Sequence, residues 1–400
     1  MQKSDIIKSL METIRELEQT EDNQKRKEKW DCIPYTSRDQ WRGLPKMDGS
    51  CLKGNVPVQV DPNNTFWAKY FNFSLKDYYL NGQVFLENYL KAIIERFKLF
   101  NDDVFVTKRV PIWMASGFEA SMFGIDVNFF DDKDPWIDHK VMIETPEDLK
   151  NMKIPDFYKS GLMPKAIEVY EYVKENLDDD FEVLFPEWIR GPFGVAVYLR
   201  GFENLLMDMM DEPEFVHELM RFIVESRKTW YDSLEKYLGR PVVKANLFND
   251  EVNCPSLSPA LYEEFVLPYE KELSEYHGGL HYWHSCGDLT PLYKDIVAIP
   301  NIDMIHKSPW SSAAEVGKVF GKVSAIEVCL NPQKDILEGS EQYMRELLTG
   351  FVKDLTEAQV QGYTLRANNI IFYNTWDFSI EKSRMFINIA REVVDHITKA

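Results

Sequence analysis

The stretch GGLHYWHSCGDL, residues 278–289, joins an apolar strand pattern to two side chains that bind metals. Its apolar part predicts a strand over 280–285, and His284 and Cys286 stand two residues apart at the end of that strand. Residues i and i+2 of an extended strand point to the same face, so a histidine nitrogen and a cysteine sulfur would converge there. Nitrogen and sulfur are preferred ligands of zinc. Taken alone, the pattern is also compatible with a core cysteine beside a hydrogen-bonded histidine.

Outward from this stretch, apolar runs alternate with helical periodicity along the chain. Strands are expected at 56–60, 104–112, 181–189, 242–248, 280–285, 302–307, 323–329 and 369–373. Helical patterns lie between most of them, for example over 164–177, 213–238, 340–359 and 379–397. Alternating β and α units imply a parallel sheet, and eight of them predict an α/β protein with a (β/α)8 TIM barrel. A doubly wound open sheet is the alternative, although no G-x-G-x-x-G follows the first strand.

The segment before the first expected strand has a different character. Residues 4–31 carry apolar side chains at helical spacing among many charges, which predicts an amphipathic helix. We therefore expect an N-terminal helical extension over 1–52 and the barrel domain over 53–400.

Charge and cysteine content exclude several classes of function. The chain has 46 basic and 65 acidic residues, so its net charge is 46 − 65 = −19. Nucleic acids and anionic membranes need basic patches, and neither partner is expected. No apolar run reaches the roughly 18 residues of a membrane span, and the N-terminus lacks the apolar core of a signal peptide. Five scattered cysteines do not form a disulfide framework, and a reducing cytoplasm is the expected location.

In a TIM barrel the chemistry lies at the C-terminal ends of the strands. The expected strand ends carry carboxylates, histidines, cysteines and aromatic side chains: Glu187, Trp188, Arg190, Asp250, Glu251, His284, Cys286, His306, Glu327, Cys329 and Trp376. Sulfur, nitrogen and oxygen ligands could therefore meet around one metal ion. The predicted ligands are His284, Cys286, Cys329 and Glu251, and the predicted catalytic carboxylates are Glu251 and Asp250.

Alternatives stay open for each of these residues. Cys329 could be a buried strand thiol, and Asp250 and Glu251 could be loop or helix-capping carboxylates. Which of the two carboxylates completes the metal site is undecided, and Cys254 is a substitute ligand to consider.

Four rim residues are expected to contact the substrate: Trp188, Arg190, His306 and Trp376. Aromatic rings at a barrel mouth stack on planar ligands, although they also pack in cores. Arg190 could clamp a carboxylate or phosphate, or pair with Glu187. His306 is expected beside the metal rather than as a ligand.

The chain resembles the uroporphyrinogen decarboxylase superfamily over about residues 100–400. The resemblance rests on five stretches in the family's order: RGPF, DEPEFVHELM, NDEVNCPSLSPALYEEFVLPYEKEL, HSCGDLTPL and AIEVCLNPQKDIL. That superfamily contains a metal-free decarboxylase and zinc-dependent, corrinoid-linked methyltransferases. The decarboxylases have an arginine-bearing R-Q-A-G-R type stretch, whereas the closest match here, VPIWMASG at 110–117, lacks the arginines. The HSCG stretch instead resembles the H-x-C-G of the methyltransferases, in which histidine and cysteine hold zinc with a further cysteine.

The chain departs from the methylcobamide:coenzyme M type, whose second cysteine follows the last strand. Here 368–374 contains no cysteine, and the one later cysteine is Cys329. A carboxylate and two cysteines on a barrel rim are more similar to the methyltransferase I components of anaerobic O-demethylases.

This resemblance implies an enzyme that uses Zn2+ to move a methyl group from a methoxylated, aromatic substrate to the cobalt of a corrinoid. The chain has no D-x-H-x-x-G cobalamin-binding motif, so the corrinoid (cobalamin) would be carried by a separate partner protein. The alternatives are a methylcobamide:thiol methyltransferase, a metal-free decarboxylase of a tetrapyrrole, and an inactive barrel that binds a corrinoid protein. A homodimer is compatible with all of them.

Overall fold

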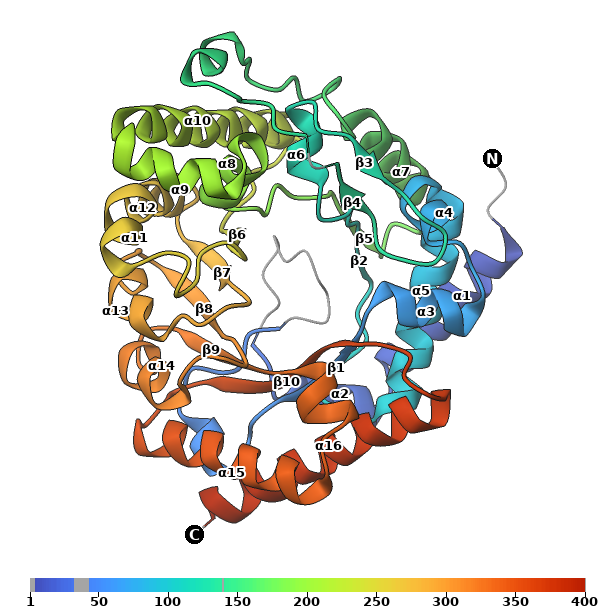
Figure 1. Ribbon diagram of the computed structural model, residues 1–400. Helices are drawn as coiled ribbons and strands as arrows, with labels where there is room; N and C mark the ends of the chain where they lie inside the picture. The colour runs from blue at the N-terminus through green and yellow to red at the C-terminus, as the bar shows by residue number, and fades with distance from the viewer. Residues whose placement is uncertain (1–3, 32–42, 139, 400) are drawn as a thin grey trace.

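The computed structural model describes residues 4–31, 43–138 and 140–399. Within these residues the strands surround a central axis and the helices lie outside them (Figure 1). The strands are β1 (Val58–Pro62), β2 (Arg109–Pro111), β3 (Val127–Asn128), β4 (Trp136–Ile137), β5 (Glu182–Leu184), β6 (Ala245–Phe248), β7 (Leu280–His284), β8 (Ile302–Lys307), β9 (Ala325–Leu330) and β10 (Tyr363–Ile370). Because consecutive parallel strands are joined by outer helices, the fold is TIM-barrel-like.

In the described part of the chain, six strands form one curled parallel sheet in the order β1-β10-β9-β8-β7-β6. β2 and β5 form a separate parallel pair, and β3 and β4 a short antiparallel one. Backbone bonds just beyond β5 connect this pair to the large sheet, since Gly191 N donates to Phe248 O and Phe248 N donates to Ile189 O.

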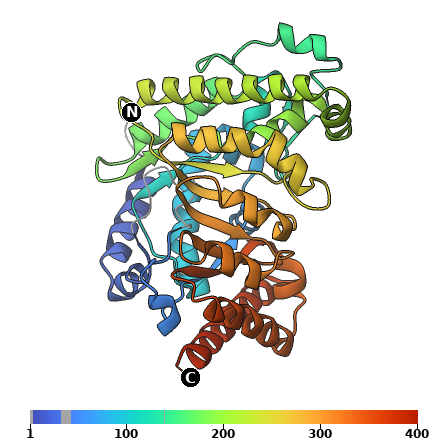
Figure 2. The ribbon, with the colours of Figure 1, turned by 90° about the vertical axis from the view of Figure 1, so that its left-hand side faces the viewer.

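Helices cover the outer side of the strands. They are α1 (Asp5–Glu18), α2 (Glu21–Lys27), α3 (Asn64–Phe71), α4 (Leu75–Leu80), α5 (Gly82–Phe100), α6 (Phe118–Met122), α7 (Met163–Asn176), α8 (Pro192–Arg200), α9 (Phe202–Asp211), α10 (Pro213–Leu238), α11 (Pro259–Phe265), α12 (Leu267–Tyr276), α13 (Tyr293–Ile296), α14 (Ala313–Phe320), α15 (Glu341–Glu357) and α16 (Trp376–Thr398). Figure 2 shows the later helices following one another along the outer wall in chain order. Among the described helices, none is both long and apolar enough to span a bilayer.

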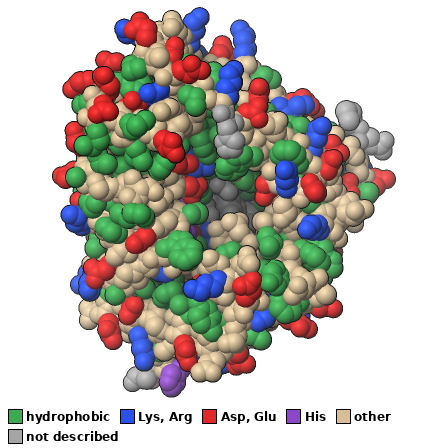
Figure 3. Space-filling view, viewed as in Figure 1, with side chains coloured by type: hydrophobic (Ala, Val, Ile, Leu, Met, Phe, Trp, Pro, Cys, Tyr) green, Lys and Arg blue, Asp and Glu red, His purple; other side chains and the backbone are tan. Residues whose placement is uncertain are grey.

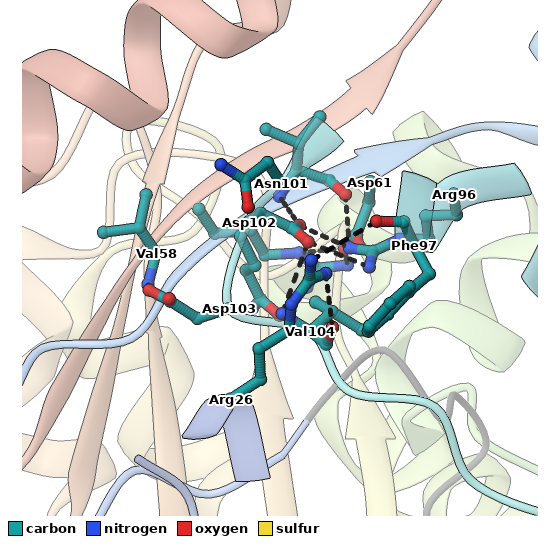
Figure 4. Close-up of polar contacts among 12 residues, drawn as sticks. Arg26, Val58, Asp61, Arg96, Phe97, Asn101, Asp102, Asp103 and Val104 are labelled. Carbon is teal, nitrogen blue, oxygen red and sulfur yellow. Dashed lines mark hydrogen bonds and ion pairs between the residues drawn. The ribbon is translucent and has the colours of Figure 1, made fainter. Parts of the chain in front are cut away.

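The edge of β1 that faces β2 is bonded largely by side chains (Figure 4). Val58 N donates to Asp103 Oδ2 at 2.8 Å, and Val60 N donates to Asp102 Oδ2 at 2.9 Å. Arg96 Nη2 donates to Val60 O at 2.6 Å and also to Asp102 Oδ2 at 2.8 Å. These bonds satisfy buried backbone groups where a neighbouring strand would otherwise do so. We call Arg96, Asp102 and Asp103 the acidic junction.

The N-terminal segment packs on the barrel and shares its core. Ile7, Met11 and Ile14 of α1 are buried in the main apolar cluster. Leu44 and Met47 pack against the inward-facing strand residues, among them Tyr282. Thr20 caps α2 and accepts from Asn23 N, so two helices stand where one was expected over 4–31. Residues 1–3 and 32–42 of the predicted extension lie outside the described residues.

The last strand differs from the expectation. β10 covers Tyr363–Ile370, whereas the apolar run at 369–373 predicted a strand six residues further along. Asn369 adopts a positive φ at the start of that run and Asn374 adopts one just after it, which interrupts the extended backbone at both ends. The true strand was harder to detect because Arg366, a charged residue, lies buried within it.

Candidate functional site

Two neighbouring strands bring three metal-binding side chains together. β6 ends at Phe248, two residues before Asp250. β7 ends at His284, and Cys286 follows two residues later. His284 Nε2 lies 3.2 Å from Asp250 Oδ1 and 3.2 Å from Cys286 Sγ. The three ligand atoms all lie within 4.8 Å of one another. The expected convergence of histidine and cysteine at the end of this strand therefore occurs, with Asp250 as the nearby carboxylate.

The spacing of these atoms fits a zinc ion. Ligand atoms on tetrahedral zinc, with bonds of about 2.0–2.3 Å, stand roughly 3.3–3.7 Å apart, close to the two distances of 3.2 Å. Asp250 Oδ1 is buried and makes no hydrogen bond of normal geometry with the described residues, which leaves it available as a ligand. Three protein ligands leave a fourth tetrahedral position, as in catalytic zinc sites.

Arg190 holds the two consecutive carboxylates that follow β6. Its Nη1 donates to Asp250 Oδ2 at 2.9 Å and to both carboxylate oxygens of Glu251 at 3.1 Å. Burial opposes ionisation of Asp250, but His284 and Arg190 outweigh it and lower the pKa of Asp250. Burial and the charge of Asp250 are the effects that raise the pKa of Glu251. Gly194 makes room for this cluster, since a Cβ there would lie 2.5 Å from Glu251 Oε2.

Cys286 is accessible to solvent yet surrounded by protein. Burial raises the pKa of its thiol, and the charge of Asp250 raises it further. The sulfur therefore carries a proton in the metal-free protein, and metal binding would release that proton.

A buried polar network lies next to these ligands, inside the barrel. The Tyr282 hydroxyl lies 3.2 Å from His284 Nδ1 and 2.8 Å from His306 Nδ1, and it donates to Glu327 Oε2. Arg366 Nη1 donates to both oxygens of Glu327 at 2.9 and 3.0 Å. Burial, aided by the nearby His284, lowers the pKa of His306 to about 3, so this imidazole is neutral.

The ligands open into a cavity of about 290 Å³. Figure 3 shows a hollow in the centre of the face seen in Figure 1. Asp250, His284 and Cys286 all line the cavity. Aromatic side chains form much of the remaining wall: Tyr78, Phe85, Tyr89, Trp113 and Phe248. A planar apolar molecule would find suitable surfaces here.

Cys329 and Glu251 lie apart from this ligand group. Cys329 Sγ groups with His306 and Glu327 instead, and lies 3.6 Å from Glu327 Oε2. β8 separates β7 from β9, so two strand spacings of roughly 4.8 Å lie between the two cysteines' strands. Glu251 is bound to Arg190 rather than to the ligands, and Asp250 occupies the position expected for it.

Three of the four residues expected to contact substrate do not line the cavity, and Arg190 is the exception. Trp188 is fully buried, packs against Phe123 and Trp230, and donates its indole N–H to Arg190 O at 3.2 Å. Trp188 does not reach the cavity because its side chain points into the helix layer and not towards the cavity mouth. Trp376 starts α16 and packs on other aromatic rings. His306 is buried below the ligands, with its ring centroid 4.1 Å from that of His284.

Sequence reasoning missed several residues of the site. Tyr282 lies two residues before His284, so the same strand periodicity that predicted the ligands could have identified it. Arg366 and Asp61 pair with each other and line the cavity. Both were missed because the expected strands 56–60 and 369–373 exclude them. Cys254, the substitute ligand considered, donates instead to Leu257 O at 3.3 Å.

Comparison with known proteins agrees with this architecture. The family model "Uroporphyrinogen decarboxylase (URO-D)" matches residues 108–368. The chain is 22% identical over 285 residues to a uroporphyrinogen decarboxylase of Trichodesmium erythraeum, covering 68% of this chain and 73% of that protein. It is 28% identical over 158 residues to one of Thermodesulfovibrio yellowstonii, covering 38% of this chain and 43% of that protein.

Among solved structures, a methyltransferase from Methanosarcina mazei has the same fold. It superposes with a TM-score of 0.62 at 14% identity, covering 87% of this chain and 98% of that one. The predicted resemblance is confirmed, and because the family model covers more than half of the sequence, the chain belongs to the uroporphyrinogen decarboxylase family.

Proposed function

We propose that this protein is a methyltransferase that moves a methyl group from a methoxylated aromatic substrate to the cobalt of a corrinoid carried by a separate protein. Asp250, His284 and Cys286 would hold a Zn2+ ion. The observation that supports this function best is the position of these three ligands on the wall of an aromatic-lined cavity.

A bound zinc ion supplies a Lewis acid that stabilises negative charge on the ether oxygen as the carbon–oxygen bond breaks. The oxygen keeps the bonding electron pair, and the cobalt(I) of the reduced corrinoid, the second substrate, supplies the pair for the new carbon–cobalt bond.

The protein's own residues prepare this reaction. Asp250 supplies a negative ligand whose second oxygen is fixed by Arg190. Glu251 accepts from the same Nη1 of Arg190 and helps to hold it in place. Phe248 packs on His284, with ring centroids 4.8 Å apart, and restricts the imidazole. The aromatic wall would bind the planar ring of the substrate and exclude water from it.

The charge of the cavity favours an uncharged substrate. The described residues that line it include Arg190, Arg366 and four carboxylates, which gives 2 − 4 = −2 without metal, and a bound Zn2+ with the thiolate of Cys286 would change the sum to −2 + 2 − 1 = −1. Each arginine is already paired with two carboxylates: Arg190 with Asp250 and Glu251, and Arg366 with Asp61 and Glu327. Neither guanidinium is therefore available for a substrate carboxylate without breaking a buried ion pair.

A decarboxylase acting on a tetrapyrrole is the second candidate, because the curated relatives carry that name. Two features argue against it here. The cavity of about 290 Å³ is at the small end of the range for even drug-sized ligands, roughly 300–1,000 Å³. Its net negative lining would also repel a carboxylate-bearing macrocycle. A methylcobamide:thiol methyltransferase would use the same metal ligands and would differ from the proposed enzyme in its substrate.

Elemental analysis and two activity assays test the proposal. We expect about one zinc per chain, release of a phenol from a methoxylated aromatic in the presence of a reduced corrinoid protein, and no carbon dioxide from uroporphyrinogen. Decarboxylation by zinc-free protein would reverse the assignment. Methylation of a thiol by methylcobalamin, without demethylation of any ether, would favour the third candidate.

Three further expectations belong to this proposal. The eight strands β1, β2 and β5 to β10 would act as one (β/α)8 barrel, with residues 1–52 as its extension. The corrinoid protein would dock at the cavity mouth. The protein would work in the cytoplasm.

A further inference from the structure

The Tyr282 hydroxyl is the meeting point of three buried groups. It donates to Glu327 Oε2 and lies 3.2 Å from His284 Nδ1 and 2.8 Å from His306 Nδ1. Tyr282 and Glu327 are fully buried, and His306 is 2% exposed. A hydroxyl has one hydrogen to donate and two lone pairs that accept, so three partners saturate it.

Counting hydrogens fixes the direction of each bond. Glu327 accepts two hydrogen bonds from Arg366 and is held as an acceptor. The single tyrosine hydrogen therefore points at Glu327. The oxygen of Tyr282 can then only accept, and each imidazole must place a hydrogen on its Nδ1.

We infer that Glu327, acting through Tyr282, holds a hydrogen on Nδ1 of His284, so that Nε2 is the ring nitrogen left to bind a metal ion. This inference rests on the proposed metal centre. The opposite nitrogen, Nε2, is the atom 3.2 Å from both Asp250 Oδ1 and Cys286 Sγ. Metal-bound histidines depend on such a partner at the other ring nitrogen for their orientation. Tyr282 and Glu327 are therefore positioning residues.

His306 restricts the orientation of the Tyr282 hydroxyl. With a hydrogen on its Nδ1, His306 occupies one lone pair of the Tyr282 oxygen, so among the described partners the hydroxyl hydrogen can point only at Glu327 or His284. A hydroxyl turned towards His284 would point a lone pair of its oxygen at the Glu327 carboxylate, which places two acceptors against each other in a buried site.

Tyr282→Phe removes the hydroxyl and keeps the ring. Its matched control is Tyr363→Phe, the same change at a fully buried tyrosine whose hydroxyl has no partner among the described residues. In titrations with Co2+ as the probe, we expect Tyr282→Phe to bind 10- to 100-fold more weakly than wild type, with a shifted visible absorption spectrum. Tyr363→Phe should match wild type in both. Equal affinity and an unchanged spectrum in Tyr282→Phe would overturn the inference.

A second measurement reads the tautomer directly. In metal-free wild-type protein labelled with 15N-histidine, we expect Nδ1 of His284 to carry a hydrogen, with the signal assigned by its loss in His284→Gln. An unprotonated Nδ1 would contradict the inference even if Tyr282→Phe failed to fold. Glu327→Gln should also weaken Co2+ binding. The glutamine amide can donate to the Tyr282 oxygen, and the tyrosine hydroxyl would then donate to a histidine Nδ1 instead of accepting from it.

These outcomes separate the inference from the proposed function. If wild-type protein binds neither Co2+ nor zinc, the metal centre is wrong, whatever the tautomer. If wild type and Tyr282→Phe bind Co2+ alike, the metal centre stands and the positioning role is lost.

Discussion

Cys286 and Cys254 have different neighbours, and these neighbours indicate which of the two cysteines can bind a metal. Cys286 lies 3.2 Å from His284 Nε2, whereas Cys254 bonds to the carbonyl of Leu257. Cys286→Ala should therefore lose bound zinc and methyl transfer while the barrel stays folded, because a catalytic metal is not what holds a large domain together. Cys254→Ala should retain zinc. Metal content and circular dichroism of both variants check this. Loss of zinc from Cys254→Ala but not from Cys286→Ala would mean that Cys254, and not Cys286, is the ligand.

Asp250 and Glu251 are consecutive carboxylates that the structure assigns to different partners. Asp250→Asn replaces a charged ligand by a neutral one, and we expect zinc affinity to fall by at least tenfold. Glu251→Gln should reduce it far less, because Glu251 contacts Arg190 rather than the ligand group. Competition with a chromophoric chelator measures both. The reverse order would make Glu251 the ligand, as the sequence first suggested.

The ligands His284 and Cys286 could be predicted from sequence because strand periodicity places i and i+2 on one face. The role of Cys329 could not, because it depends on how far two strands of a curved sheet converge. The exclusion of Trp188 from the cavity also needed the structure, since a strand-end aromatic ring can turn towards either layer.

At the scale of elements, β7 and the helix outside it share a buried acid. Glu270 of α12 accepts from Tyr262 Oη at 2.7 Å and from Trp283 Nε1 at 2.9 Å. Burial nevertheless raises the pKa of Glu270 from 4.5 to about 7. Between these two values the folded protein binds a proton that the unfolded chain does not. The free energy of unfolding therefore decreases as the pH rises from about 4.5 to about 7.

Glu270→Gln should remove this part of the pH dependence, because an amide oxygen accepts the same two bonds without ionising. At pH 8 we expect the variant to be more stable than wild type by up to about 3 kcal/mol, given about 1.4 kcal/mol per pKa unit. Urea unfolding between pH 5 and pH 8 measures it. Glu264→Gln, at an exposed glutamate of α11, is the matched control and should keep the wild-type slope. Identical slopes for all three proteins would refute the assignment.

Elements with a strong pattern were located well from sequence. β8 and α10 lie at 302–307 and 213–238, as expected. Ser258 caps α11 ahead of Pro259, a pair of residues typical of helix starts. β10 was located poorly because a buried charged residue, Arg366, interrupts its apolar pattern.

For the whole molecule, the eight-fold alternation was enough to predict a TIM-barrel-like parallel arrangement. The acidic junction between β1 and β2 could not be predicted, because nothing in Asp102-Asp103 distinguishes strand-bonding carboxylates from loop carboxylates.

The net charge of the cavity leads to a prediction about substrates. A neutral methoxybenzamide should be demethylated with a kcat/KM roughly 10- to 100-fold above that of the matching methoxybenzoate, because an unpaired carboxylate in this cavity costs about 1.4–3 kcal/mol. A methoxyphenol should resemble the amide. Steady-state rates with one reduced corrinoid protein compare the three, and preference for the benzoate would mean that Arg190 or Arg366 is released from its ion pairs.

The acidic junction also has a consequence for how the barrel opens. Amides within a ladder exchange their hydrogens when two backbones part, whereas those of Val58 and Val60 are protected by carboxylates that can rotate away. Asp102→Asn should therefore speed deuterium uptake at β1 while uptake at β7 and β8 stays unchanged, with Asp179→Asn, at an exposed site, as control. Figure 1 shows β7 and β8 across the ring from β1 and β2. Thermal opening would then begin at β1 and β2, on the side opposite the ligands. β7, which carries His284, can stay ordered while the backbone of β1 opens locally.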